Sequence, residues 1–132
     1  MDEATRRALM AIVGPEHVLA SPEDLLCYTY DASPIPMGPA HAPALVVFPG
    51  CTEEVARIVL LANEAGFVLC PRGAGSNVSG GSIPDRDAVV MVLTRMNRIL
   101  EIDQANMIAE VEPGVITEHF QTAVEKLGLF YP

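Results

Sequence analysis

Three short apolar runs constrain the fold of this chain more than any other feature of its sequence. Residues 44–48, 67–70 and 88–93 are almost wholly apolar, which is typical of strands buried on both faces of a sheet. Between the first two runs, an apolar stripe at helical spacing follows Thr52, a candidate N-cap, and stops at Gly66. Strand, helix and strand in this order predict a βαβ unit with a right-handed crossover.

The segment before the first strand is predicted to hold two helices and an irregular connector. Apolar spacing predicts a helix over residues 3–13, and Ser21, which precedes a proline and two acids, is typical of the start of a second, short helix. Residues 32–43 contain four prolines, which cannot support a regular helix or strand throughout. We therefore divide the chain into N-terminal helices with a proline-rich connector, residues 1–43, and a sheet-bearing part, residues 44–132.

After the third strand, the pattern changes to that of a hairpin and a helix. Residues 99–103 and 107–112 alternate roughly between apolar and polar side chains around a short polar turn, which predicts two antiparallel strands. Thr117 is predicted to cap a last helix that ends at Gly128. The predicted fold class is α+β, with a βαβ unit and an antiparallel hairpin in a small mixed sheet and with flanking helices.

Length and composition fit one folded domain and exclude several classes of partner. The chain has 132 residues, of which 50% are hydrophobic and 19% charged, and its net charge is −9. The apolar content suffices for a core. The acidic balance repels nucleic-acid phosphates and anionic lipid, so we expect neither a nucleic acid nor a membrane surface as partner. No stretch resembles a signal peptide or a transmembrane segment.

The cysteines and histidines give no sign of a disulfide framework or a metal site. Their number and spacing fit neither pattern, so we expect reduced thiols, a cytoplasmic location, and histidines that neither bind metal nor act in catalysis. These residues are Cys27, Cys51, Cys70, His17, His41 and His119.

The strongest candidate for a binding site is the glycine-rich stretch of residues 71–82, which directly follows the second strand. Its glycines permit positive φ angles and let backbone N–H groups converge on an anion. Serine and asparagine side chains add further donors, and Arg72 adds a positive charge. The stretch is therefore a candidate cradle for phosphate oxygens, while the same composition also fits a mobile surface loop.

Two familiar phosphate motifs are excluded by position. The dinucleotide-binding fingerprint needs a glycine or alanine where Val78 stands and a helix immediately afterwards, whereas residues 82–84 lead to another strand. A P-loop needs a lysine, and this region contains none. Backbone amides, hydroxyl groups and Arg72 would therefore have to hold the anion.

The stretch and its surroundings resemble one flavoprotein fold. The run from Pro71 to Gly81 resembles the pyrophosphate-binding loop of the vanillyl-alcohol oxidase fold, also called the PCMH-type FAD-binding fold. Residues 47–55, 93–99 and 111–115 resemble, in the right order, three other segments of that fold. Within it, the chain is similar to the FAD-containing subunits of glycolate oxidases and to related D-lactate or D-2-hydroxyacid dehydrogenases.

This resemblance implies a set of cofactor contacts. The loop of residues 72–81 would wrap the FAD diphosphate, mostly through backbone amides, and a second turn would lie near the cofactor. Members with covalent flavin often carry a histidine at the position of Ser76, so the resemblance implies noncovalent FAD. Residues 131–132 match the start of a segment that runs past the flavin. The implied contact residues are Pro71, Arg72, Gly73, Ala74, Gly75, Ser76, Asn77, Ser79, Gly80 and Gly81 in the loop, and Pro113, Gly114 and Val115 in the turn.

The resemblance also implies the function of the whole protein. We expect an FAD-dependent oxidoreductase that converts glycolate or a D-2-hydroxyacid to the 2-oxoacid, with this chain as the N-terminal part of its FAD domain. The substrate-handling residues of the family lie beyond the position of Pro132, so no catalytic residue is assigned and the chain alone is expected to be inactive. Other oxidase subunits or a second copy are the expected protein partners.

Two alternative functions stay open. The chain could be a noncatalytic fragment or binding module that does not hold FAD by itself. It could also belong to another flavin oxidase of the same fold that acts on an alcohol or an ether-lipid precursor.

Overall fold

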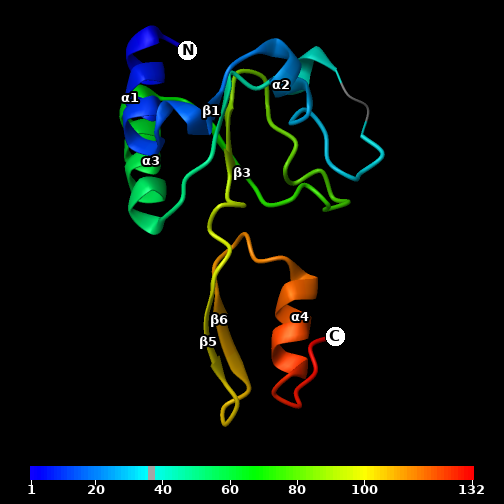
Figure 1. The fold of residues 1–132 in the computed structure, drawn as a ribbon. Helices are drawn as coiled ribbons and strands as arrows, with labels where there is room; N and C mark the ends of the chain where they lie inside the picture. Colours follow the sequence, from blue (N-terminus) through cyan, green and yellow to red (C-terminus); the bar gives the residue numbers. More distant parts are fainter. Residues whose placement is uncertain (36–37) are drawn as a thin grey trace.

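Two lobes joined by a narrow neck make up the structure, a computed structural model that describes residues 1–35 and 38–132 (Figure 1). The upper lobe carries a four-stranded sheet, and the lower lobe carries a hairpin and the last helix. Pro36, one of the connector prolines, lies outside the described residues. Within these two ranges, no helix is long and apolar enough to cross a membrane.

The four-stranded sheet has the order β1 (Val18–Leu19), β2 (Leu45–Val47), β4 (Val89–Val92), β3 (Leu69–Arg72). Strand β4 runs parallel to both of its neighbours, whereas β1 runs antiparallel to β2. Helix α3 (Thr52–Ala65) connects β2 to β3, and β4 fills the place between these two strands. The predicted strand-helix-strand unit is therefore present, with both of its strands paired to β4.

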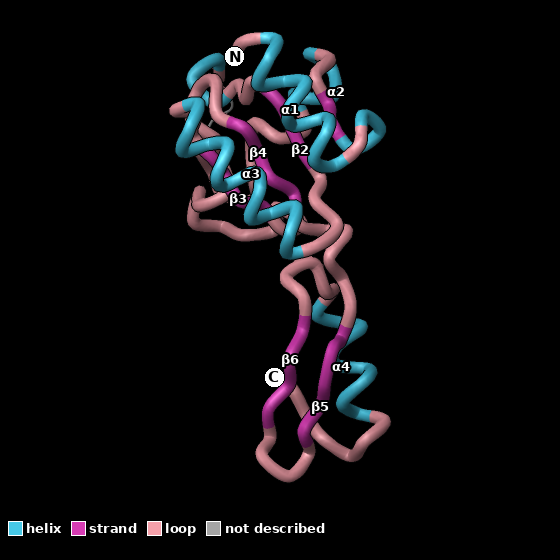
Figure 2. Tube along the Cα trace, turned by 90° about the vertical axis from the view of Figure 1, so that its left-hand side faces the viewer, coloured by secondary structure: helices cyan, strands magenta, loops and turns pink. Residues whose placement is uncertain are grey.

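Alternate residues of the strands bury the two faces of this sheet. One face packs against α1 (Glu3–Val13) and α3, which lie side by side over it in Figure 2. The other face packs against Leu25 of α2 (Pro22–Leu26) and against Tyr28 and Phe48. The buried hydrophobic strand residues are Val18, Leu45, Val47, Val89 and Met91 on the first face and Val46, Cys70, Val90 and Val92 on the second.

Three of the predicted helix ends are confirmed, and two of the predicted caps are wrong. The hydroxyl of Ser21 accepts a hydrogen bond from the backbone N–H of Asp24, and both Gly66 and Gly128 have the left-handed conformation that ends a helix. Thr52 and Thr117 are the first helical residues rather than caps, because the chain turns helical one residue earlier than predicted. Neither helix has a side-chain cap.

The second predicted strand is displaced by two residues. Phe67 donates its backbone N–H to Ala62 and so belongs to the end of α3, and the strand runs over Leu69–Arg72 instead of residues 67–70. Since β3 is an edge strand, the Val68 side chain before it is exposed and Pro71 is tolerated within it.

The hairpin forms a separate sheet. Strands β5 (Ile99–Asp103) and β6 (Ile108–Val111) pair with each other, and α4 (Thr117–Glu125) lies beside them. The α+β class and the mixed sheet are confirmed, but β1 rather than the hairpin supplies the antiparallel pairing. Two short 3₁₀ turns, Pro15–His17 and Pro39–His41, complete the described elements.

Candidate functional site

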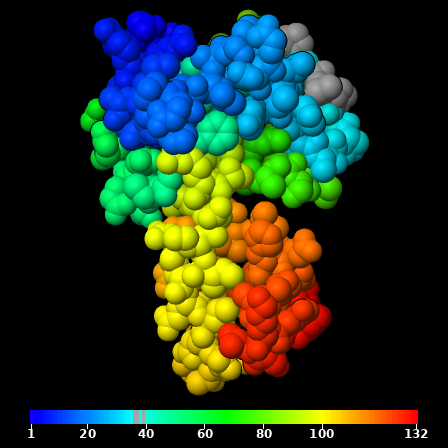
Figure 3. Space-filling view, viewed as in Figure 1, coloured from blue at the N-terminus to red at the C-terminus, as the bar shows by residue number. Residues whose placement is uncertain are grey.

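The glycine loop, residues 72–82, leaves the sheet at the carboxyl end of β3. In open sheets with parallel strands, this end is where ligands usually bind. The loop forms the lower edge of the upper lobe in Figure 1 and faces the start of α4 across a gap. The space-filling view shows this face hollowed between the green atoms of the loop and the orange atoms at the start of α4 (Figure 3). A ligand bound at the loop would therefore lie between the two lobes.

Arg72, at the start of the glycine loop, is buried and braces it. Its Nη1 atom donates to the backbone oxygen of Tyr30 at 2.7 Å and to that of Ser82 at 3.4 Å. The guanidinium carbon lies 5.5 Å from the centre of the Tyr28 ring, within cation–π range. The side chain thus ties both ends of the loop to the segment after α2, while its role as an anion ligand stays a prediction.

A second set of hydrogen bonds fixes the middle of the glycine loop. The Asn77 amide donates to Asp31 Oδ2 at 2.5 Å, and its oxygen accepts from the Ser82 hydroxyl at 2.6 Å. The Asp31 carboxylate also accepts from the backbone N–H of Ser33 at 2.8 Å. Hydrogen bonding from Ser33 lowers the pKa of Asp31 more than burial raises it, and donors on Asn77 and Gly80 lower it further. Asp31 therefore holds the loop as a carboxylate.

The backbone of the glycine loop offers many free donors. Within residues 1–35 and 38–132, no backbone N–H of residues 73–79 donates a hydrogen bond to the chain. Gly75 and Gly80 have φ angles of 73° and 76°, a region that favours glycine. A Cβ on Gly73 would meet nothing within 4 Å, so the backbone there is open to a ligand. This arrangement fits the oxygens of a diphosphate, which accept hydrogen bonds and need no cation at each contact.

The turn of residues 113–115 is seated on the chain that leaves β4. The N–H of Gly114 donates to the carbonyl of Met96 at 2.7 Å. A Cβ at Gly114 would collide with the carbonyl oxygen of Leu93, so only glycine permits this close approach. The turn leads directly into α4, and the ribbon view places it next to the neck, below the glycine loop (Figure 1).

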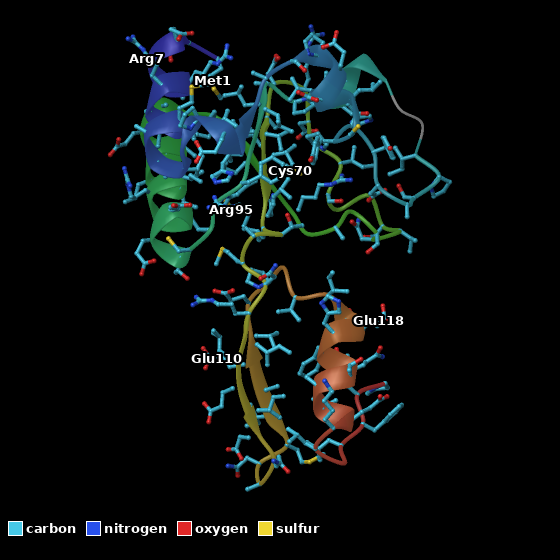
Figure 4. All side chains as sticks on the ribbon, viewed as in Figure 1. Met1, Arg7, Cys70, Arg95, Glu110 and Glu118 are labelled. Atoms are coloured by element: carbon cyan, nitrogen blue, oxygen red, sulfur yellow. The ribbon has the colours of Figure 1, made fainter. Side chains whose placement is uncertain are left out.

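Charged pairs hold the neck on the other side of this gap. Glu112 is buried and accepts hydrogen bonds from the Nε, Nη2 and backbone N–H of Arg98 at 2.6–3.0 Å. These bonds lower the pKa of Glu112. Arg95, which Figure 4 shows where the sheet meets the neck, donates to the Phe48 carbonyl at 2.5 Å and lies 3.8 Å from Glu54. The first pair thus closes the base of the hairpin, and Arg95 ties the start of the neck to the upper lobe.

The remaining sequence candidates lie elsewhere. The Tyr131 ring packs edge-on against Phe120 at 4.9 Å, in a groove between the hairpin and α4, rather than at the glycine loop. His41 lies 3.2 Å from the Pro84 carbonyl, and His119 lies in α4. Among the residues that the structure describes, no cluster of histidine, cysteine and acidic side chains could hold a metal ion.

Asp31 and the Tyr30 carbonyl are the site components that sequence reasoning missed. The pattern Asp-x-Ser at residues 31–33 is typical of a turn in which the carboxylate accepts from the backbone two residues later. That pattern could have predicted the turn. It could not have predicted Asn77, which is 46 residues away along the chain, as the second partner.

Comparison with known proteins shows the family of this chain. The sequence model of the FAD binding domain family matches residues 43–132. The glycolate oxidase subunit GlcD of Bacillus subtilis is 40% identical over 127 residues, which cover 96% of this chain and 26% of GlcD. A D-lactate dehydrogenase of Anaerostipes hadrus is 35% identical over 120 residues, 91% of this chain and 25% of that protein.

Solved structures share the fold as well. The crystal structure of p-cresol methylhydroxylase with substrate bound superposes with a TM-score of 0.84 at 28% sequence identity, over 96% of this chain and 25% of that one. The present chain therefore spans about a quarter of the length of the relatives that it matches.

Proposed function

Because the chain belongs to the FAD binding domain family, we propose that residues 72–81 of its glycine loop bind the diphosphate of FAD. The observation that carries this proposal is the row of backbone N–H groups over residues 73–79 that donate to no described residue, at the carboxyl end of a parallel strand. Pro71 precedes this row, and Ser76, Ser79 and Gly81 lie on its exposed side. Their exposure leaves them accessible to a cofactor.

The turn of residues 113–115 is proposed as the second contact. Its backbone is fixed against the end of β4 by the close approach of Gly114, so Pro113 and Val115 flank a rigid point opposite the glycine loop. A flavin held between the loop and this turn would touch both lobes. Since Ser76 offers no ring nitrogen for a covalent bond to flavin, we propose that FAD is held noncovalently.

For the whole protein, we propose the oxidation of a small 2-hydroxyacid. The relatives include a glycolate oxidase subunit and a D-lactate dehydrogenase, whose names point to substrates of this class. Bound FAD would supply the two-electron acceptor for this oxidation. The described residues bind and orient the cofactor, and no residue of this chain is assigned as the base that takes the substrate proton.

Titration of the purified chain with FAD tests the binding proposal directly. We expect saturable binding with one FAD per chain, measured as a change in flavin fluorescence, and a higher unfolding temperature in the presence of FAD. A chain that folds but leaves both signals unchanged would support the alternative of a noncatalytic fragment that holds no cofactor by itself.

The variant Gly73→Ala locates the binding site. A Cβ there meets no atom of the chain within 4 Å, so the fold should be unaffected, but the methyl group would stand where the diphosphate approaches the backbone. We expect FAD affinity to fall about tenfold or more, the effect of roughly one lost charge-assisted hydrogen bond. Gly38→Ala, also in open space but outside the loop, is the matched control and should bind as the wild type does.

The substrate class requires the full-length enzyme. We expect it to reduce an artificial electron acceptor with glycolate or D-lactate as donor. Oxidation of a phenolic alcohol, with neither hydroxyacid accepted, would instead favour another flavin oxidase of this fold.

A further inference from the structure

The segment Tyr28–Ser33, which lies outside the residues matched by the family model, contacts the glycine loop along its length. The Tyr30 carbonyl accepts from Arg72, at the start of the loop. The backbone N–H of Ala32 donates to the carbonyl of Asn77 at 3.1 Å. Ile35, two residues further on, places its Cδ1 atom 2.6 Å from the point where a Cβ on Gly80 would stand. This segment and Ile35 therefore contact the loop at its start, its middle and its end.

Asp31 is the centre of this contact. Its side chain is buried, and its two carboxylate oxygens accept from different parts of the chain, Oδ1 from the Ser33 N–H and Oδ2 from the Asn77 amide. The Asn77 oxygen in turn accepts from Ser82, which also offers its carbonyl to Arg72. One carboxylate thus orients a chain of hydrogen bonds that runs across the glycine loop.

The chemistry of this network requires an acceptor at position 31. Because Asn77 directs its amide hydrogens toward Asp31 and its oxygen toward Ser82, a neutral amide at position 31 would set donor against donor. A buried donor without an acceptor destabilises the arrangement that it belongs to. Either the Asn77 side chain would then have to rotate, or the loop would have to move away from residue 31.

We infer that Asp31 is a positioning residue for the FAD loop: through Asn77 and Ser82 it fixes the loop backbone, whose N–H groups at residues 73–79 donate to no described residue of the chain. This inference rests on the proposed function, since it assigns Asp31 a role in FAD binding. Asp31 itself is not expected to touch the cofactor, because its carboxylate is occupied by groups of the chain.

The variant Asp31→Asn tests the inference with two separate readouts. The first is tryptic cleavage after Arg72 in the FAD-free chain, which requires the buried guanidinium to leave the Tyr30 carbonyl. We expect this cleavage to become at least about threefold faster, while cleavage after the exposed Arg86 stays constant. The second readout is FAD affinity by fluorescence titration, which should fall about tenfold, the loss expected for one hydrogen bond to a charged group.

Asp103→Asn is the matched control. Asp103 accepts from a backbone N–H and from the side-chain amide of Asn106, as Asp31 does from Ser33 and Asn77, but it lies at the tip of the hairpin. This variant should change neither readout. If Asp31→Asn fails to fold, Ser82→Ala removes only the last hydrogen bond of the network and should weaken FAD binding about threefold.

The outcomes separate this inference from the proposed function. A folded Asp31→Asn chain with wild-type cleavage after Arg72 overturns the inference. Faster cleavage with unchanged FAD affinity also overturns it, because Asp31 would then be a structural residue only. Failure of the wild-type chain to bind FAD would refute the proposed function, and the cleavage readout would still decide whether Asp31 fixes the loop.

Discussion

Gly114 shows how one residue can set the geometry between the two lobes. Its α-carbon approaches the backbone of residues 93–96 so closely that a Cβ would meet the carbonyl oxygens of Leu93 and Met96. Neither carbonyl can move freely, because the Met96 carbonyl accepts from the Gly114 N–H and the Leu93 carbonyl accepts from the Met96 N–H. The position is therefore closed to any residue but glycine unless the neck shifts.

We predict that Gly114→Ala lowers the free energy of unfolding by about 2 kcal/mol, as for other cases of overpacking. Urea unfolding followed by circular dichroism measures this change. Gly73→Ala, where a Cβ meets no neighbour, should lie within about 0.5 kcal/mol of the wild type. Equal stability of the two variants would show that the neck is not packed as described.

Glu112 makes the stability of the neck depend on pH. Hydrogen bonds from the Arg98 side chain and backbone lower the pKa of this carboxyl below its usual value of 4.5. A depressed pKa in the folded state stabilises the protein at every pH above the pKa of the unfolded chain. That contribution is lost as the pH falls through the lower, folded pKa.

We therefore predict that Glu112→Gln removes part of the stability at neutral pH and reduces the loss of stability between about pH 5 and the acid limit of folding. Unfolding midpoints measured across this pH range check the prediction. Glu110→Gln is the control, since Glu110 is exposed and lies on the side of the hairpin away from α4 (Figure 4). Parallel pH profiles for the wild type and Glu112→Gln would contradict it.

At the scale of elements, α3 is held by one stripe of its surface. Ile58 is fully buried against the sheet, whereas Leu60, two residues along the helix, is 61% exposed. Ile58→Ala should cost about 2–5 kcal/mol, because it opens a cavity where α1, α3 and the strands meet. Leu60→Ala should cost less than about 0.5 kcal/mol. Denaturant unfolding of both variants distinguishes this packing from one in which α3 is only loosely attached.

Sequence reasoning predicted these elements well where burial alone decides them. The apolar runs that became β2 and β4 are buried on both faces, as their composition indicated. Sequence reasoning was wrong where long-range contacts determine the bounds or the pairing of a strand. The strand β3 begins later than predicted because the end of α3 uses Phe67, and the hairpin stands apart because β1, a two-residue strand with no recognisable pattern, takes the free edge of β2.

The candidate site could also be predicted only in part. Its contiguous part, the glycine-rich stretch after a strand, could be predicted because composition and position suffice for a loop with free amides. Its supports before β2 could not, since Tyr30 lies 42 residues from Arg72 in the sequence and Asp31 lies 46 residues from Asn77. Turn chemistry at Asp31 indicates a bend but not the neighbour that the bend reaches.

At the scale of the whole molecule, the two lobes differ in the amount of apolar surface that they bury. Both clusters of core residues belong to the upper lobe. Among the described residues that follow the neck, Val124 is the one buried hydrophobic residue, while Met107, Ile108 and Phe130 are more than 60% exposed. The groove between the hairpin and α4 is lined by apolar side chains that remain accessible.

The smaller buried apolar surface of the lower lobe predicts that this lobe opens more readily than the upper one. Backbone amides exchange with solvent through openings whose free energy follows local burial, so β5, β6 and α4 should exchange faster than β2 and β4, by about tenfold or more. Hydrogen–deuterium exchange resolved by residue or peptide measures this directly. Equal protection in both lobes would mean that they open together and that the neck transmits the stability of the upper lobe.

FAD should reduce the difference in amide exchange rate between the two lobes if it binds between them. A ligand that contacts both the glycine loop and the turn at Gly114 stabilises the closed arrangement of the neck and slows exchange in α4 as well as at the ends of β3 and β4. A ligand held by the loop alone would protect the upper lobe and leave the hairpin and α4 unchanged. Exchange measured with and without FAD therefore tests the second proposed contact independently of affinity, and Gly73→Ala, which weakens binding without disturbing the fold, is the control.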